Sequence, residues 1–345
     1  MNGSSPAPSR GAPTLDDVAR AAGVSLATAS RVLNGSSRKV AESYRERVEA
    51  SAAQLGYTAN LSAQATARGT SGIIALLVAD IADPYFGQLA AGVARGADEA
   101  GLIVTIAITE RDPQREVRLV RALRGQRPRG LILAASRTAG PDAAGLQTEL
   151  DAFAGMGGRV VALGPAGGGI RSVAIDNQGG SRALGAELAR LGYRDAVIVG
   201  AAVGVRTSDD RIAGFTEGFT SAGGRIREVR HGHFTRDGGY AAGQEIVAAG
   251  LAPGTLIFGI SDVVAIGVMS AVRDAGRTVG DDIAVAGFDD IATGRDIRPG
   301  LTTVRVPLED LGYRALHAAL EEEWDAVQPI NSLDVIVRGS TPPIG

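Results

Sequence analysis

Residues 14–34 read TLDDVARAAGVSLATASRVLN, the pattern of two short helices joined by a tight turn. Thr14 can cap the first helix, and Asp17 at its third position favours the positive end of the helix dipole. Gly23 supplies the left-handed residue that a sharp turn between helices requires. Ser25 can then cap the second helix. The stretch predicts a helix-turn-helix, whose second helix can lie in the major groove of DNA.

The apolar positions agree with this prediction. The first helix has one apolar face, and small Ala19 on that face allows the second helix to cross it closely. In the second helix Ala29, Val32 and Leu33 are spaced to pack inward. The positions left to face outward are Leu26, Ala27, Thr28, Ser30, Arg31 and Asn34. An ordinary amphipathic helical hairpin is the alternative, but caps, turn glycine and crossing residue all agree with the helix-turn-helix.

Four segments carry a family resemblance. Residues 24–35 (VSLATASRVLNG) closely resemble the recognition helix of the lac-repressor (LacI/GalR) family of bacterial transcription regulators. Residues 55–60 (LGYTAN) resemble its link to a hinge helix, and residues 285–291 (VAGFDDI) and 301–304 (LTTV) resemble its effector-binding core. The resemblance extends from about residue 14 to residue 338. It implies a sequence-specific DNA-binding repressor whose operator affinity is controlled by a small-molecule effector, a sugar or sugar derivative.

The resemblance also implies a set of DNA-contacting residues: Thr14, Ser25, Leu26, Ala27, Thr28, Ser30, Arg31, Asn34, Tyr57, Asn60, Ala63 and Thr66. Thr66 departs from the family, which usually places there a leucine that wedges between base pairs. The segment from Asn60 to Arg68 suits a hinge helix, but helices shorter than about 12–15 residues are marginal alone in water. We expect its formation to depend on DNA and on a partner hinge.

Composition limits the other possibilities. The chain has 345 residues and no cysteine, which suggests two to three domains and excludes disulfides and thiolate metal sites. Its histidines are His231, His233 and His317. We interpret the His-x-His pair as part of a solvated strand or loop, and we expect no metal and no cofactor. The longest apolar run, residues 73–79, is far below the roughly 18 residues of a membrane span. Without a signal-peptide pattern, the N-terminus predicts a flexible tail of a cytoplasmic protein.

The charge is distributed unevenly. The formal net charge is −3. Residues 1–69 contain eight basic and five acidic side chains, so they carry +3 and the remainder carries −6. A basic head on an acidic body favours DNA phosphates at one end of the molecule.

After residue 72 short apolar runs alternate with helical patterns. The predicted strands are 73–79, 102–108, 130–135, 159–163, 195–199, 255–259 and 283–287. The predicted helices include 86–99, 114–124, 181–191, 208–221 and 262–275, and residues 40–55 are expected to form a third helix of the head. This order predicts an α/β core of parallel sheets covered by helices on both faces. The resemblance implies two doubly wound, periplasmic-binding-protein-like subdomains, with the chain crossing near residues 175, 304 and 330.

These patterns give the expected organisation. It comprises a tail (1–13), a helix-turn-helix domain (14–59), a hinge helix and linker (60–71) and an effector-binding and dimerisation core (72–345). Within the core, one subdomain spans about 72–174 and 304–330, and the other about 175–303 and 331–345. We expect a homodimer on a near-palindromic operator, because one recognition helix reads only a few base pairs. The chain ends soon after the strand expected at 333–337, without the heptads that would build a tetramer.

Ligands of open α/β sheets lie at the carboxyl ends of the strands. Polar and aromatic residues follow three of the expected strands there: residues 80–86 (DIADPYF), residues 176–177 (DN) and Asp289. Such a set can bind hydroxyls and cover an apolar sugar face, although an aspartate at a strand end often only caps the next helix. Mapped on the family, the expected effector contacts are Tyr85, Phe86, Asp176, Arg211, Phe234, Ser261 and Asp289.

Arg211 is the expected main anchor, because its five donors suit vicinal hydroxyls or a carboxylate. The alternative is a surface arginine that pairs with Asp209 or Asp210. Residues 164–169 (GPAGGG) stand where the family commonly has an acidic residue, so a standard hexose is not implied. This run lacks the G-x-G-x-x-G spacing of a phosphate loop and does not clearly open a helix, so we expect no nucleotide site there.

Two other function classes compete with a transcription regulator. An enzyme could use such a fold, but the chain has no G-x-S-x-G, H-E-x-x-H or Walker motif, and its only lysine is Lys39 in the head. A transport receptor would share the core. That class requires export, which the absence of a signal-peptide pattern and the helix-turn-helix both disfavour.

Overall fold

Three helices form around the quoted stretch: α1 (Leu15–Ala22), α2 (Leu26–Leu33) and α3 (Glu42–Leu55). Thr14 and Asp17 form a reciprocal capping box, in which the Thr14 N–H donates to Asp17 Oδ2 at 2.9 Å. Gly23 ends α1 with φ of 62°, the left-handed conformation that the turn was predicted to need. Val18, Ala29 and Val48 form the centre of a small core. The helix-turn-helix prediction is confirmed, although the third helix begins at Glu42 instead of residue 40.

The computed structural model describes residues 12–33, 40–58, 70–135, 143–164, 169–324, 329–330 and 333–344. The expected DNA contacts Asn34, Asn60, Ala63 and Thr66 lie outside these ranges. Contacts divide the chain between Ser71 and Gly72 into two units, and the second unit is built on two large sheets.

The first sheet contains β1 (Ile73–Val78), β2 (Ile103–Ile108), β3 (Gly130–Leu133), β4 (Arg159–Leu163) and β5 (Arg171–Val173). These strands are parallel in the order β2-β1-β3-β4-β5. Its helices are α5 (Pro84–Glu99), α6 (Pro113–Gly125), α7 (Ala143–Ala154) and α13 (Leu308–Leu320). We call this part the N-subdomain.

The second sheet contains β6 (Asp195–Ala201), β7 (Arg225–Gly232), β8 (Thr255–Gly259) and β9 (Ile283–Ala286), all parallel in the order β7-β6-β8-β9. Its helices are α8 (Asn177–Arg190), α9 (Arg206–Ser221), α10 (Arg236–Ala248), α11 (Asp262–Asp274) and α12 (Ala292–Asp296). A short antiparallel pair, β10 (Thr303–Arg305) and β11 (Asp334–Ile336), adjoins it. We call this part the C-subdomain.

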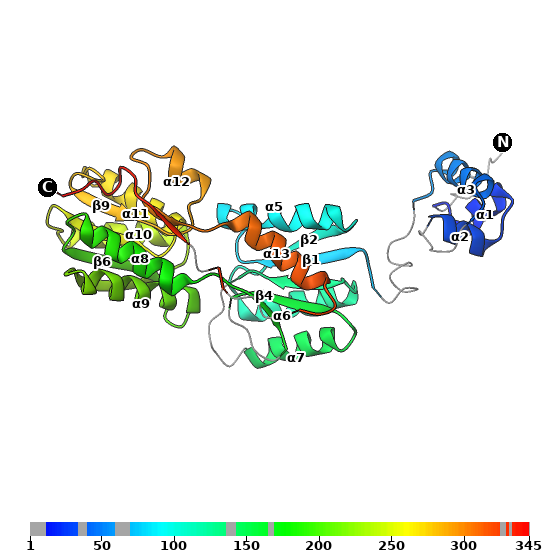
Figure 1. The fold of residues 1–345 in the computed structure, drawn as a ribbon, viewed down its shortest axis with the longest axis horizontal. Coiled ribbons are helices and arrows are strands. Elements are labelled where there is room, and N and C mark those ends of the chain that lie inside the picture. Colours follow the sequence, from blue (N-terminus) through cyan, green and yellow to red (C-terminus); the bar gives the residue numbers. More distant parts are fainter. Residues whose placement is uncertain are drawn as a thin grey trace, which may run out of the picture. The chain divides into compact units, whose positions relative to one another are not determined.

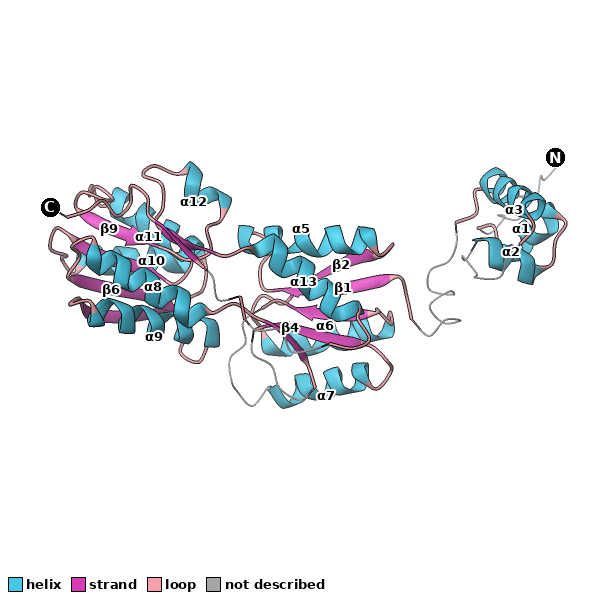
Figure 2. Cartoon of the chain, viewed as in Figure 1, coloured by secondary structure: helices cyan, strands magenta, loops and turns pink. Residues whose placement is uncertain are grey.

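Helices cover both faces of each sheet, as the alternation of strands and helices predicted (Figure 2). Because successive side chains of a strand point to opposite faces, Leu76 of β1 joins the core under α5 and α13, while Leu77 joins the core under α6 and α7. In Figure 1, α13 runs beside α5 although more than 200 residues separate them. This pairing brings α13 back to the N-subdomain, whereas the last described residues lie on the C-subdomain, where the Ile344 N–H donates to the Leu191 carbonyl.

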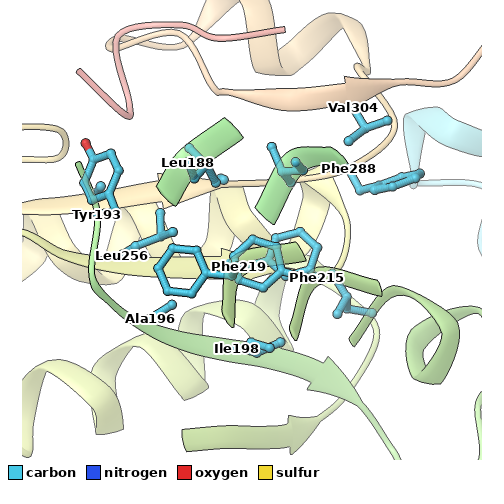
Figure 3. Close-up of a cluster of buried hydrophobic side chains, with 14 of the residues drawn as sticks. Leu188, Tyr193, Ala196, Ile198, Phe215, Phe219, Leu256, Phe288 and Val304 are labelled. Carbon is cyan, nitrogen blue, oxygen red and sulfur yellow. The ribbon is translucent and has the colours of Figure 1, made fainter. Parts of the chain in front are cut away.

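The strands of the C-subdomain also direct alternate side chains into two cores, one on each face of the sheet. Ile198 of β6 packs with Phe215, Phe219 and Leu188 under α8 and α9 (Figure 3). The Phe215 ring stacks on Phe258 of β8 with centroids 4.4 Å apart. The opposite face of β6 packs against α10 and α11. A continuous apolar strand is therefore buried on both faces, which is typical of parallel sheets.

The sequence analysis did not name α7, α10, α12, α13 or the strands β7 and β10, whereas β11 confirms the strand expected at 333–337 and β5 is the short strand before Asp176. Strand β7 is an edge strand whose Arg225, Arg227 and Glu228 are exposed, so it lacks the apolar run that marks a buried strand. Helix α8 begins at Asn177, four residues earlier than predicted, because the Asp176 carboxylate accepts the Gly179 N–H at 2.7 Å.

The chain passes from the first sheet to the second between β5 and α8, and returns between β10 and α13. A bridge joins Ile175 to Ile330, and another joins Asp289 to Arg305. Both lie near the carboxyl ends of the sheets, where the cleft described below is found. None of the helices in the described part of the chain combines the length and the hydrophobicity that a membrane span requires.

Candidate functional site

Helix α2 presents the outward row that the sequence predicted. Leu26 is 50% exposed, and Ala27 and Arg31 are also exposed. Thr28 and Ser30 are partly buried, and the Thr28 N–H donates to Ser25 Oγ at 3.1 Å, which fixes the start of the helix. The row combines apolar, hydroxyl and cationic groups, the mixture that reads base edges and phosphates.

The other expected DNA contacts of the head have structural partners. Thr14 is exposed and belongs to the capping box of α1. Tyr57 is half-buried against the small core of the head, and its N–H donates to the Ala52 carbonyl at 2.9 Å. Thr14 thus fixes the start of α1, and Tyr57 packs on the core of the head. The family resemblance expects both residues to contact DNA.

A small cavity of about 40 Å³ lies between the carboxyl ends of the two sheets. Five of the expected effector contacts line it: Tyr85, Phe86, Arg211, Phe234 and Asp289. Among the other lining residues are Asp83, Arg111, Asn177 and Thr207, which the family mapping did not include. Ligand pockets usually measure about 300 Å³ or more, so the cleft is nearly closed in this conformation.

Arg211 is the most constrained side chain of the cleft. It is 2% exposed, and its Nη2 donates to Asp289 Oδ1 at 2.8 Å. Its Nε donates to Asn177 Oδ1 and its Nη1 to the Ile260 carbonyl, both at 2.8 Å. The guanidinium also lies 3.8 Å from the centroid of the Phe288 ring. The alternative of a surface pair with Asp209 or Asp210 is wrong.

Asp289 is buried at the turn that follows β9, with φ of 120°. Burial raises the pKa of its carboxyl, and the adjacent Arg211 guanidinium opposes the rise. Non-glycine residues with positive φ cost free energy and are typical of functional sites. The turn therefore uses strain to direct this carboxylate toward Arg211.

Aromatic side chains of α5 form the other wall. Tyr85 and Phe86 contact edge to face with centroids 5.0 Å apart, and burial raises the pKa of the Tyr85 hydroxyl. Asp83 caps α5 by accepting the Tyr85 N–H at 3.0 Å, and burial raises the pKa of its carboxyl. The turn before α5 thus orients two apolar rings and one carboxylate at the cavity.

Two expected effector contacts do not line the cavity. The Asp176 carboxylate is used as the cap of α8, and its neighbour Asn177 lines the cavity instead. Ser261 precedes α11, is 2% exposed and is not among the lining residues. Both residues follow strand ends, so the sequence pattern located the correct edge of the sheet without distinguishing caps from lining residues.

Arg111 is a charged lining residue that sequence reasoning missed. It follows β2, so the rule that ligands lie at strand carboxyl ends could have found it. Its guanidinium carbon lies 4.4 Å from the centroid of the Phe234 ring, and Nη2 donates to the Phe234 carbonyl at 3.4 Å. Arg111 belongs to the N-subdomain and Phe234 to the C-subdomain, so this contact spans the cleft.

Comparisons with protein families match both units. Residues 14–60 match the model described as bacterial regulatory proteins, lacI family, and residues 186–341 match the periplasmic binding protein-like domain. The HTH-type transcriptional regulator GalR of Escherichia coli (strain K12) is 30% identical over 309 residues, which cover 89% of this chain and 88% of that protein. CelR of Thermobifida fusca, named likewise, is 32% identical over 344 residues, which cover 95% and 98% of the two chains.

Solved structures agree with this result. The lac repressor dimer bound to operator and the anti-inducer ONPF superposes with a TM-score of 0.79 at 25% identity, covering 96% of this chain and 99% of that one. A complex of the transcriptional regulator CelR with cellobiose superposes with a TM-score of 0.68 at 29% identity, covering 95% and 99%.

Proposed function

The chain belongs to the lacI family of bacterial regulatory proteins and is a DNA-binding transcriptional regulator, and from that premise we propose that it is a repressor whose operator affinity responds to a carbohydrate effector held in the cleft. The observation that carries the proposal is that one chain contains both an exposed helix α2 in its first unit and a polar and aromatic cleft in its second unit. Its relatives are regulators, which favours this function over an enzyme or a transport receptor. We place the activity in the cytoplasm, with the DNA.

The cleft supports a carbohydrate ligand by its chemistry. Asn177, Thr207 and Arg211 offer hydrogen-bonding groups, and Tyr85, Phe86 and Phe234 offer aromatic surface. Sugars are bound by this combination of directed polar groups and apolar rings. Because the cavity measures only about 40 Å³, entry of a sugar must widen the cleft. Its binding therefore favours a different angle between the subdomains.

We propose that this angle controls the DNA-binding heads through residues 60–71. Ligands and DNA that prefer different angles are coupled, typically by about 1–3 kcal/mol. A change of this size alters operator affinity by about fivefold to 150-fold. We expect such a change of angle to bend the chain near residues 175 and 305, between β5 and α8 and between β10 and α13.

We further propose a homodimer that uses the edge of the first sheet. Strand β2 forms that edge, and its Ile103 and Ile106 are 57% and 42% exposed. Exposed apolar edge strands readily pair with another chain. A two-fold pair of heads would read half-sites about one helical turn, roughly 34 Å, apart.

The test combines DNA binding with ligand screening. The full-length protein is mixed with fragments of its own promoter region, and bound fragments are footprinted. Sugars, sugar acids, sugar phosphates and polyols are screened by thermal shift, and each hit is then added to the protein–DNA complex. We expect a near-palindromic footprint and a hit that shifts operator affinity at least fivefold. A hit that binds without changing operator affinity would contradict the proposed coupling.

A further inference from the structure

Arg111 is held in an uncommon backbone conformation at the cleft. Glu110 and Arg111 both have left-handed φ, 55° and 57°. This conformation is unfavourable for residues other than glycine. The Glu110 N–H donates to the Ala79 carbonyl at 2.9 Å, which ties the turn to the end of β1. The turn therefore stabilises a geometry in which the Arg111 side chain lines the cavity.

The Arg111 guanidinium has few partners in the cleft. It contacts the face of the Phe234 ring and makes one long hydrogen bond, 3.4 Å, to the Phe234 carbonyl. Among the described residues, no carboxylate oxygen forms an ion pair with it within 4.0 Å. Asp83 and Asp80 act on it electrostatically from farther away, and the Asp83 carboxylate already accepts the Tyr85 N–H. Most of the five N–H donors of Arg111 remain available at the cavity.

Arg211, in contrast to Arg111, has close partners for its charge and its donors. Its guanidinium is paired with Asp289, bonded to Asn177 and Ile260, and stacked on Phe288. The charges of Arg211 and Asp289 thus balance each other within the protein. Arg111 is the cleft cation whose charge lacks a close partner among the described residues, although the side chain is partly buried and removing a charge from water without a partner is costly.

We infer that the effector carries an acidic group, a carboxylate or a phosphate, which pairs with Arg111. The inference rests on the proposed effector function of the cleft and specifies its ligand as an acidic sugar derivative. The contact between Arg111 and the Phe234 ring favours an acidic ligand over a neutral one. A neutral sugar reaches the face of the Phe234 ring only by pushing the cation away from it. An acidic ligand draws the guanidinium off the ring and forms the charge-assisted hydrogen bonds that it lacks.

The test compares matched neutral and acidic sugars. Binding of glucose, gluconate, glucuronate and glucose 6-phosphate to the full-length protein is measured by isothermal titration calorimetry, and the galactose set is treated in the same way. We expect one acidic compound to bind about tenfold or more tightly than its neutral parent, the size of one good charge-assisted contact. The carboxylate and phosphate arms show which acidic group the cleft takes.

Two substitutions assign the preference to Arg111. Arg111→Gln should reduce the preference for the acid at least fivefold, while Arg111→Lys, which keeps the positive charge, should retain most of it. Arg118→Gln is the matched control, because Arg118 lies on α6 with its side chain 64% exposed and 3.9 Å from Asp112. The control should leave the preference unchanged. If Arg111→Gln does not fold, Arg111→Ala takes its place, with the same expected loss of the preference for the acid.

Several results would overturn the inference. Tighter binding of a neutral sugar than of its acids would refute it while leaving the proposed effector function intact. An acid preference that survives Arg111→Gln would refute the role of Arg111. If no compound binds while the protein still binds its operator, the carbohydrate assignment fails and the inference fails with it.

Discussion

Arg211 of α9 and Asp289 after β9 form an ion pair of 2.8 Å whose side chains are only 2% and 6% exposed. Side chains so far from water gain from their partner chiefly because each charge would otherwise be buried alone. The two residues expected to bind an effector are therefore also structural partners. A substitution at either one changes stability and ligand binding together.

The first prediction concerns this pair. Arg211→Met leaves the Asp289 carboxylate buried without its cation, so it should destabilise the protein by about 3–5 kcal/mol. Adding Asp289→Asn removes that charge, and the double variant should lose less than the sum of the two single variants. Urea unfolding of all four proteins measures the difference. Additive losses would show that the two side chains do not interact as the structure indicates.

The second prediction concerns the contact of α8 with α9. A Cβ atom at Gly214 would lie 2.1 Å from the Gln178 carbonyl oxygen of α8. Gly214→Ala should therefore force the helices apart and destabilise the protein by about 2 kcal/mol or more. Gly87→Ala is the control, because Gly87 lies on α5 with no atom within 4 Å of its added methyl group. That change should be neutral or stabilise by up to about 1 kcal/mol. Thermal unfolding ranks the two variants.

The third prediction concerns pH. Asp262 is buried at the start of α11, and burial raises its pKa to about 8. The Ile291 N–H and the Thr303 hydroxyl contact its carboxyl at 2.8 and 2.6 Å. The folded protein thus keeps a proton that the unfolded chain releases near its ordinary pKa of 3.8. Stability should fall as pH rises toward 8, by at most about 1.4 kcal/mol for each pH unit.

Asp262→Asn tests this linkage because asparagine stays neutral at every pH. The stability advantage of the variant over wild type should grow between pH 5 and 8 in urea unfolding. Asp195→Asn is the control, since arginines bonded to Asp195 lower its pKa and keep it ionised across this range. Its difference from wild type should stay constant. A parallel pair of curves for Asp262→Asn and wild type would exclude a protonated Asp262.

The fourth prediction concerns the dimer. Ile106→Lys places a charge on the exposed edge strand β2 and should shift the protein toward monomer in sedimentation, with a matching loss of operator affinity. Val203→Lys is the control, because Val203 is 74% exposed and lies before α9 in the C-subdomain. It should leave the assembly unchanged. A dimer that survives Ile106→Lys at the same concentrations would exclude this edge as the interface.

The fifth prediction concerns DNA. Arg31→Ala removes an exposed cation from α2, so operator binding should weaken about tenfold. The slope of the logarithm of the binding constant against the logarithm of the salt concentration should become shallower by about one. Arg20→Ala on α1 is the control, since Arg20 is already paired with Asp16 and Asp17. Fluorescence anisotropy across a salt series measures both effects. Equal behaviour of the two variants would remove α2 from the DNA interface.

Most features that depend on neighbouring residues could be predicted from the sequence. The caps at Thr14 and Ser25, the turn at Gly23 and the apolar strands all depend on residues close together in the chain, and the structure confirms them. Strand ends likewise pointed to Tyr85 and Asp289 at the edge where the cavity lies. Strand β7 escaped prediction because an exposed edge strand needs no apolar run.

Periodicity and capping act over a few residues, so the helix-turn-helix, the α/β alternation and the general place of the cleft can be predicted from the chain alone. Which polar groups meet across the cleft depends on the packing of distant elements. The tertiary structure paired Arg211 with Asp289, made Asp176 a cap and brought Arg111 onto Phe234. Partners 78 and 123 residues apart are chosen by how sheets and helices pack. No short-range pattern records that choice.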